Sequence, residues 1–166
     1  MSSSPRGFCG RPRSVYRASS LQAMAANEPD VSPFSGLIGI EFLSNDPDNA
    51  QARVEVRDDL KQPYGYLHGG VIMSMIDELC SRSTVMQVIM DGGVALGQSL
   101  DVSLMRSVQS GTVTVTARAR HRGKTSWVWD AEAADDSGRL CALARMTVAI
   151  RPFEQGGKTE VREDSG

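Results

Sequence analysis

The sequence predicts an α+β protein in which one long helix is wrapped by a curved antiparallel β-sheet. Apolar residues recur at a spacing close to 3.6 in a single long segment, residues 70–90. From residue 94 to residue 150 the pattern changes to an alternation with a period of two, which is typical of strands. A helix that is apolar around most of its circumference has to be covered, and one curved sheet can cover it.

Length and composition place further limits on the protein. With 166 residues, the chain is long enough for one domain with a sizeable core. Its 18 basic and 20 acidic residues give a net charge of -2, so no overall field favours nucleic acid or a membrane surface as a partner. Three widely spaced cysteines form no CxxC pair and predict neither a disulfide framework nor a metal site. Without a long apolar run or a secretory signal, we expect a soluble cytoplasmic protein.

The two ends of the chain differ in composition from the rest. Residues 1–27 are rich in arginine and serine and contain no acidic residue before Glu28, and we assign residues 1–33 to a leader. This composition fits a disordered or processed leader, a start codon assigned ahead of Met24, or a transit peptide that would direct the protein to the mitochondrial matrix. We expect the folded domain to span residues 34–152 and the charged segment 153–166 to be a disordered tail.

Two short elements are expected before the helix. Residues 35–43 predict a helical turn that leads into a strand, and residues 44–49 have the composition of a turn. Residues 50–56 alternate between apolar and polar side chains, which predicts a half-buried strand.

Four strands are expected after the helix, which should end at the Asp-Gly-Gly sequence of residues 91–93. In the third of these strands Trp127 and Trp129 share one face, and we expect them to pack in the core or at an interface. A sheet of this kind exposes an edge strand, and exposed edges favour edge-to-edge dimers. The turns are spaced for an antiparallel meander of strands over residues 94–105, 112–121, 126–135 and 139–150.

The most informative stretch is residues 62–84, a glycine-containing loop that leads into the helix. Gly69 and Gly70 let a ligand approach the helix start, where the first amide hydrogens have no partner within the helix. Such a helix end attracts an anion or a carbonyl oxygen. Asp77 and Ser81 share a face further along, so the same helix also carries a carboxylate. This combination points to hydrolytic chemistry.

A family resemblance rests on this stretch. The sequence His68-Gly69-Gly70 is followed by Asp77 nine positions after the histidine, and the strands downstream keep a matching order. In these residues the chain resembles the hotdog-fold acyl-CoA thioesterases of the 4-hydroxybenzoyl-CoA thioesterase superfamily, most closely their phenylacetate-pathway (PaaI-like) type. The similarity covers about residues 34–152.

The resemblance implies a role for each residue of the motif. The residue matching Asp77 is the catalytic carboxylate, either a nucleophile on the thioester carbon or a general base on water. The backbone amide matching Gly69 binds the thioester oxygen, and the side chain matching His68 supports that loop. Gln62 matches a polar position that reaches the site from the opposite subunit, and Ser81 matches a serine or threonine that positions water. Proteins of this family form dimers with shared active sites, and the dimers pair into tetramers.

The chain departs from the family pattern at two positions. Some relatives carry a water-holding serine or threonine where our alignment places Gly97, so Ser81 or Ser99 would have to replace it. The proline that usually follows Arg106 is Ser107 here, which affects only the end of a strand.

The substrate implied by the family adds further candidate residues. Coenzyme A carries phosphates, and basic side chains are expected near the mouth of its binding site. Gly70 belongs to the loop that would hold the thioester. The basic candidates for the phosphates are Arg106, Arg122 and Lys124.

The candidate carboxylate has a rival and a simpler interpretation. We favour catalysis by Asp77 over a structural ion pair because a buried carboxylate costs free energy unless it is paired or used. Glu78 is the alternative carboxylate, but it lies about 100° around the helix and is expected to face solvent or an ion pair. Cys80 is expected on the core side, where a thiol is not activated as a nucleophile.

We therefore expect an enzyme that hydrolyses an acyl- or aroyl-CoA thioester to the free acid and CoA, without a cofactor or a metal. One alternative is a hydroxyacyl-thioester dehydratase of the same fold, which the spacing of His68 and Asp77 fits less well. The other is a non-enzymatic module that binds or senses acyl-CoA. A pure binding module would not require Gln62, Gly69, Asp77 and Ser81 together.

Overall fold

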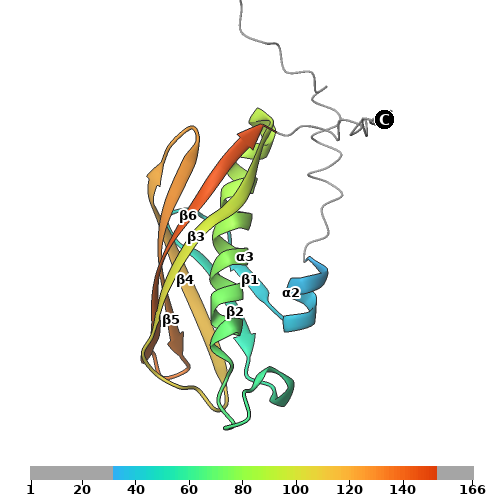
Figure 1. Ribbon diagram of the computed structural model, residues 1–166, viewed down its shortest axis with the longest axis vertical. Helices are drawn as coiled ribbons and strands as arrows, with labels where there is room; N and C mark the ends of the chain where they lie inside the picture. Colours follow the sequence, from blue (N-terminus) through green and yellow to red (C-terminus); the bar gives the residue numbers. More distant parts are fainter. Residues whose placement is uncertain (1–31, 153–166) are drawn as a thin grey trace, which may run out of the picture.

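The computed structural model describes residues 32–152, in which a single six-stranded antiparallel sheet curves around one long helix (Figure 1). This confirms the predicted α+β architecture. The expected leader and tail lie outside the described residues, apart from the last two positions of the leader. The elements are α2 (Pro33–Ile38), β1 (Glu41–Ser44), β2 (Ala50–Glu55), η1 (Asp58–Leu60), α3 (Gly69–Val88), η2 (Ile89–Asp91), β3 (Gly93–Leu104), β4 (Thr112–Arg122), β5 (Ser126–Asp135) and β6 (Leu140–Pro152).

The central helix α3 begins and ends at the signals in its sequence. His68 is its N-cap, and the His68 Nδ1 accepts a hydrogen bond from the Gly70 N–H at 3.0 Å. The helix continues into the short 3₁₀ turn η2, which ends at Gly92 with a φ of 77°. Because side chains strongly disfavour positive φ, glycine is the residue that can end the turn in this way.

The order of the strands corrects one prediction. Strands β4, β5 and β6 form the expected meander, but β3 does not pair with β4. It pairs with β6 instead and forms one edge of the sheet, while β1 forms the other. The reason is the connection from residue 105 to residue 111, which is too long for a tight hairpin. It passes the start of α3, where the Val108 carbonyl accepts from the Leu67 N–H at 2.7 Å.

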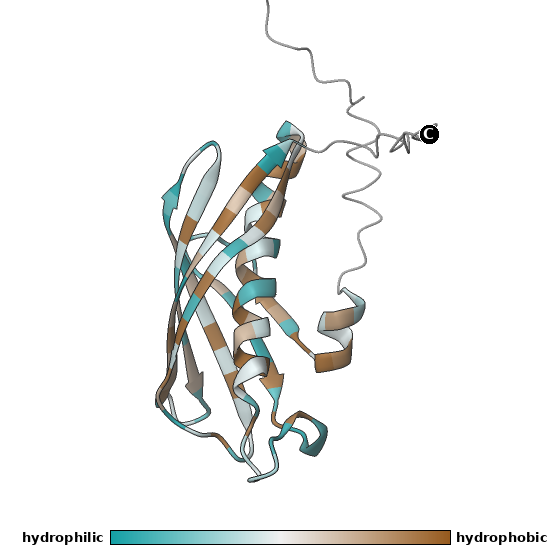
Figure 2. Ribbon diagram, viewed as in Figure 1, coloured by the Kyte–Doolittle hydropathy of each residue, from teal (hydrophilic) through white to brown (hydrophobic). Residues whose placement is uncertain are grey.

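The core lies between α3 and the concave face of the sheet. Brown, apolar segments of the helix and the strands alternate with polar ones in Figure 2. The Trp129 indole Nε1–H donates to the Thr84 Oγ1 at 3.0 Å, and both side chains are fully buried. Trp127 packs beside Trp129 with 6.0 Å between ring centroids, which confirms core packing for this pair. Other fully buried side chains are Val54, Met75, Ile76, Leu79, Cys80, Val113, Val115, Met146 and Val148.

Two further observations concern the thiol of Cys80 and the length of the helices. Cys80 is fully buried, which confirms that it lies on the core side, and this burial raises the pKa of its thiol. Within residues 32–152, no helix is both long and apolar enough to cross a membrane.

Candidate active site

Asp77 lies on α3 and points toward β3 at Gly97. A Cβ atom placed on Gly97 would be 2.6 Å from the Asp77 Oδ1, closer than real Cβ contacts come. The carboxylate therefore occupies the space that a side chain at position 97 would fill. It opens on a cavity of about 460 Å³, which we call the β3 cavity, lined by Met73, Ser74, Asp77, Gly97, Gln98, Ser99, Leu100 and Met146.

Gly97 explains one departure from the family pattern. Sequence alignment puts it where some relatives hold water with a hydroxyl, yet here the missing side chain seats the carboxylate. Of the two proposed substitutes, Ser99 lines the β3 cavity with Asp77, and Ser81 lines a second cavity with it. The sequence analysis did not assign this role to Gly97. A glycine inside a strand pattern is, however, a signal that another group approaches the strand closely.

The surroundings of Asp77 make its carboxylate more basic than usual. Partial burial raises the pKa of Asp77, and the neighbouring negative charge of Glu78 raises it further. In the single chain the side chain is nevertheless exposed to solvent. A carboxylate of this kind can reach a substrate and can act as a nucleophile or a base.

Glu78 has a different role from Asp77. Its Oε2 accepts hydrogen bonds from the Ser35 hydroxyl at 2.5 Å and from the Ser32 hydroxyl at 3.3 Å. Ser32 is also the N-cap of α2, so these contacts attach the short helix α2 to α3. The geometry thus gives Glu78 a structural function and leaves Asp77 as the carboxylate that faces open space.

The loop before α3 places the other residues of the motif. The Gly70 N–H is taken by His68, so this amide is not available to a substrate. Gly70 as a substrate-binding residue stays a prediction, since only its amide is accounted for. The Gly69 N–H has no hydrogen-bond partner among the residues described, and His68 holds the loop in place around it. Gln62 lies in an adjacent turn, where its backbone N–H donates to the Tyr66 carbonyl at 2.9 Å.

Within one chain, the Gly69 amide does not lie beside the Asp77 carboxylate. Asp77 is eight residues beyond Gly69 on a continuous helix, and a rise of 1.5 Å per residue separates them by about 12 Å along the axis. A thioester carbonyl bound to the Gly69 amide would therefore be out of reach of the Asp77 carboxylate of the same chain.

The basic candidates lie at opposite ends of the sheet. Arg106 follows β3 near the start of α3, and its backbone N–H donates to the Cys141 carbonyl at 3.2 Å. Arg122 forms an ion pair with Asp48 and lies over the Trp127 ring, 5.6 Å from its centroid. Lys124 is exposed in the turn after Arg122, at the end of the sheet opposite to Arg106.

A second cavity of about 360 Å³ adjoins Asp77 on the side of α2, and we call it the α2 cavity. It lies against α3, and residues of both edge strands, β1 and β3, line it. Asp77 and Ser81 line it together, as the shared helix face predicts. Its other lining residues are Ser32, Pro33, Phe42, Glu78, Arg82, Val85, Val94 and Ala95.

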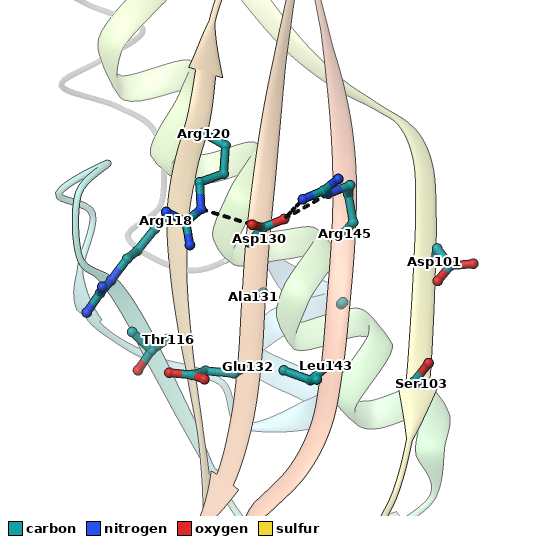
Figure 3. A pocket seen from close by; sticks show the side chains of 11 residues that line it. Asp101, Ser103, Thr116, Arg118, Arg120, Asp130, Ala131, Glu132, Leu143 and Arg145 are labelled. Carbon is teal, nitrogen blue, oxygen red and sulfur yellow. Dashed lines mark hydrogen bonds and ion pairs between the residues drawn. The ribbon is translucent and has the colours of Figure 1, made fainter.

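The outer face of the sheet carries a hollow of about 500 Å³ that lies apart from Asp77 (Figure 3). Asp130 lies at its centre and pairs with Arg120 at 2.9 Å and with Arg145 at 2.7 Å. These arginines lower the pKa of Asp130 despite its partial desolvation. The carboxylate at the centre of this hollow is therefore already paired with two arginines. Within residues 32–152, no three His, Cys, Asp or Glu side chains gather as metal ligands.

Comparison with known proteins assigns the family. A model of the thioesterase superfamily matches residues 64–142. A 1,4-dihydroxy-2-naphthoyl-CoA hydrolase from Listeria monocytogenes is 33% identical over 114 residues, which are 69% of this chain and 92% of that protein. The chain belongs to the thioesterase superfamily. This confirms the predicted superfamily, whereas the PaaI-like type remains a prediction.

Solved structures agree with the fold of this superfamily member. A crystal structure of a mutant of thioesterase PA1618 from Pseudomonas aeruginosa has a TM-score of 0.69 and 30% identity, covering 85% of this chain and 98% of that chain. A Staphylococcus aureus thioesterase has a TM-score of 0.70 and covers 73% of this chain and 100% of its own at 29% identity. In one structure of this protein a glutamate is replaced by alanine. In another, the residue replaced by alanine is a glutamine that lies fifteen positions before that glutamate. The hotdog fold is thus confirmed.

Proposed function

We propose that this superfamily member is an acyl-CoA thioesterase in which Asp77 supplies the catalytic carboxylate. The observation that carries the proposal is the placement of Asp77, which is open to the β3 cavity and seated against Gly97. The hydrolysis of a CoA thioester by the related Listeria enzyme supports the substrate class. Gln62 and Asp77 are also separated by fifteen positions, as are the glutamine and glutamate substituted in the Staphylococcus protein.

The active site would be built from two copies of the chain. Because one chain holds Gly69 about 12 Å from its own Asp77, the amide donor must come from a partner. The edge strand β3 and the adjacent face of α3 offer a surface for that partner. Their exposed apolar side chains include Met73, Met86 and Leu96, and Met90 of η2 is exposed beside them in sequence. We propose a homodimer with two shared sites, and a pairing of dimers into a tetramer.

The reaction uses these groups in a defined order. The Gly69 amide of one chain would bind the thioester oxygen and stabilise the negative charge that develops there, which is worth about 3 kcal/mol per donor. The Asp77 carboxylate of the other chain would either attack the thioester carbon or remove a proton from an attacking water. In both cases the C–S bond breaks and the thiolate of CoA leaves and takes up a proton. If Asp77 attacks, water then hydrolyses the mixed anhydride and restores the carboxylate.

The test is the release of free thiol from a panel of aryl, short-chain and long-chain acyl-CoA esters. The wild-type protein should release CoA from at least one class, and Asp77→Asn should lower kcat at least about 10³-fold, since no other described carboxylate faces the β3 cavity. Glu78→Gln is the matched control and should retain most of the activity because its amide oxygen can still accept from Ser35. Equal rates for Asp77→Asn and the wild type would refute the proposal.

A further inference from the structure

The α2 cavity contains a cation that thioester hydrolysis does not require. Arg82 follows Ser81 on α3, and its Cζ lies 4.8 Å from the centroid of the Phe42 ring. The Arg82 Nε is buried and has no hydrogen-bond partner among residues 32–152. Within the same residues Arg82 also forms no ion pair, as the described ion pairs involve other arginines and Lys61.

The position of Glu78 makes this isolation unusual. Glu78 lies four residues before Arg82, the spacing at which a glutamate and an arginine normally pair on a helix. Here the Glu78 carboxylate is held by the hydroxyls of Ser35 and Ser32 instead. Because the Nε is buried, the terminal Nη groups of Arg82, which form no ion pair within residues 32–152, are the donors that a ligand in the cavity can reach.

The cavity connects Arg82 to the reacting carboxylate. Arg82 lies five residues beyond Asp77, about 7.5 Å along the helix axis. This is close to the span of one aromatic ring with a substituent or of a short aliphatic chain. The walls between them combine the apolar Phe42, Val85 and Val94 with polar residues of α3 and α2.

We infer that Arg82 selects acyl groups that carry an acceptor oxygen at the end distant from the thioester. This inference rests on the proposed function, because it places the acyl group in the α2 cavity with its carbonyl at Asp77. A carboxylate matches the planar fork of a guanidinium with two parallel hydrogen bonds, and a phenol oxygen can accept one. The Phe42 ring lies against one face of the guanidinium, so the terminal Nη groups at its edge can donate to such a group.

The experiment compares benzoyl-CoA with 4-hydroxybenzoyl-CoA and 4-carboxybenzoyl-CoA. We expect the wild-type kcat/KM to be at least about tenfold higher for one or both substituted esters, mainly through KM, as hydrogen bonds to a charged group are worth that much. Arg82→Met should lower this preference at least tenfold, and Arg82→Lys should retain part of it. Arg53→Met makes the same change at an exposed arginine of β2 and should keep the preference. The better substituted ester identifies the acceptor as a phenol or a carboxylate.

Two results would overturn the inference. One is a wild-type protein that does not distinguish the three esters. The other is an Arg82→Met variant that slows all three equally, which would mean that Arg82 supports the fold or a contact between chains. Failure of the proposed function is a separate result, namely no thiol release from any ester. Calorimetric binding of the three esters to Asp77→Asn, with and without Arg82→Met, measures the same preference without turnover.

Discussion

Replacing Gly97 with alanine tests whether the glycine seats the Asp77 carboxylate, to which we assign catalysis. The new Cβ would lie 2.6 Å from the Asp77 Oδ1, whereas ordinary contacts begin at 3.4 Å. The carboxylate would have to move by about 0.8 Å, and a displacement of this size near reacting atoms costs about 10- to 100-fold in rate. The second close contact, 3.2 Å from the Met146 Cε, is the end of a flexible side chain and can adjust.

The assay is steady-state thiol release, with urea unfolding as a measure of the fold. We expect Gly97→Ala to lower kcat by that factor, while Ser103→Ala, on the outer face of the same strand, leaves kcat unchanged. In an Asp77→Ala background the clash disappears, so the two positions should show a coupling of about 0.5–3 kcal/mol in the free energy of unfolding. A Gly97→Ala enzyme with wild-type kcat would show that Asp77 does not lie against Gly97 during catalysis.

Two further predictions concern the charge beside Asp77 and the shared site. Glu78 raises the pKa of Asp77, so Glu78→Gln should lower it, and the acid limb of the pH profile of kcat/KM should move to lower pH. An acid limb that stays in place or moves to higher pH would contradict this effect of Glu78 on the pKa of Asp77. Mixing Asp77→Asn with Gln62→Ala after unfolding and refolding should restore about a quarter of wild-type activity, because half of the dimers are mixed and each has one intact site. No recovery would place both residues in a site within one chain.

Most of the fold could be predicted because its elements carry local signals. The period of α3, the Asp-Gly-Gly stop at residues 91–93 and the alternating strands each reflect contacts within a few residues. The pairing of β3 with β6 could not be predicted, since nothing local to β3 specifies its neighbour. It depends on the path of residues 105–111, which the backbone of Leu67 helps to fix.

The candidate site likewise has features that local sequence predicts and features that depend on contacts distant in sequence. Asp77 and Ser81 were predicted to share a helix face, and they line one cavity together. The role of Gly97 was missed because it depends on a contact between α3 and β3 that is distant in sequence. Likewise, the isolation of Arg82 follows from the hydrogen bonds that hold Glu78 to α2, which no helical spacing reveals.

The length of α3 between Gly69 and Asp77 also affects how the enzyme should behave on dilution. If an isolated chain carries two half-sites and no whole one, the specific activity becomes a function of total protein concentration. Below the dissociation constant of the dimer, the initial rate would rise with the square of the protein concentration, and above it the dependence would become linear. The helix would then make turnover respond to the amount of the protein itself, without any other regulator.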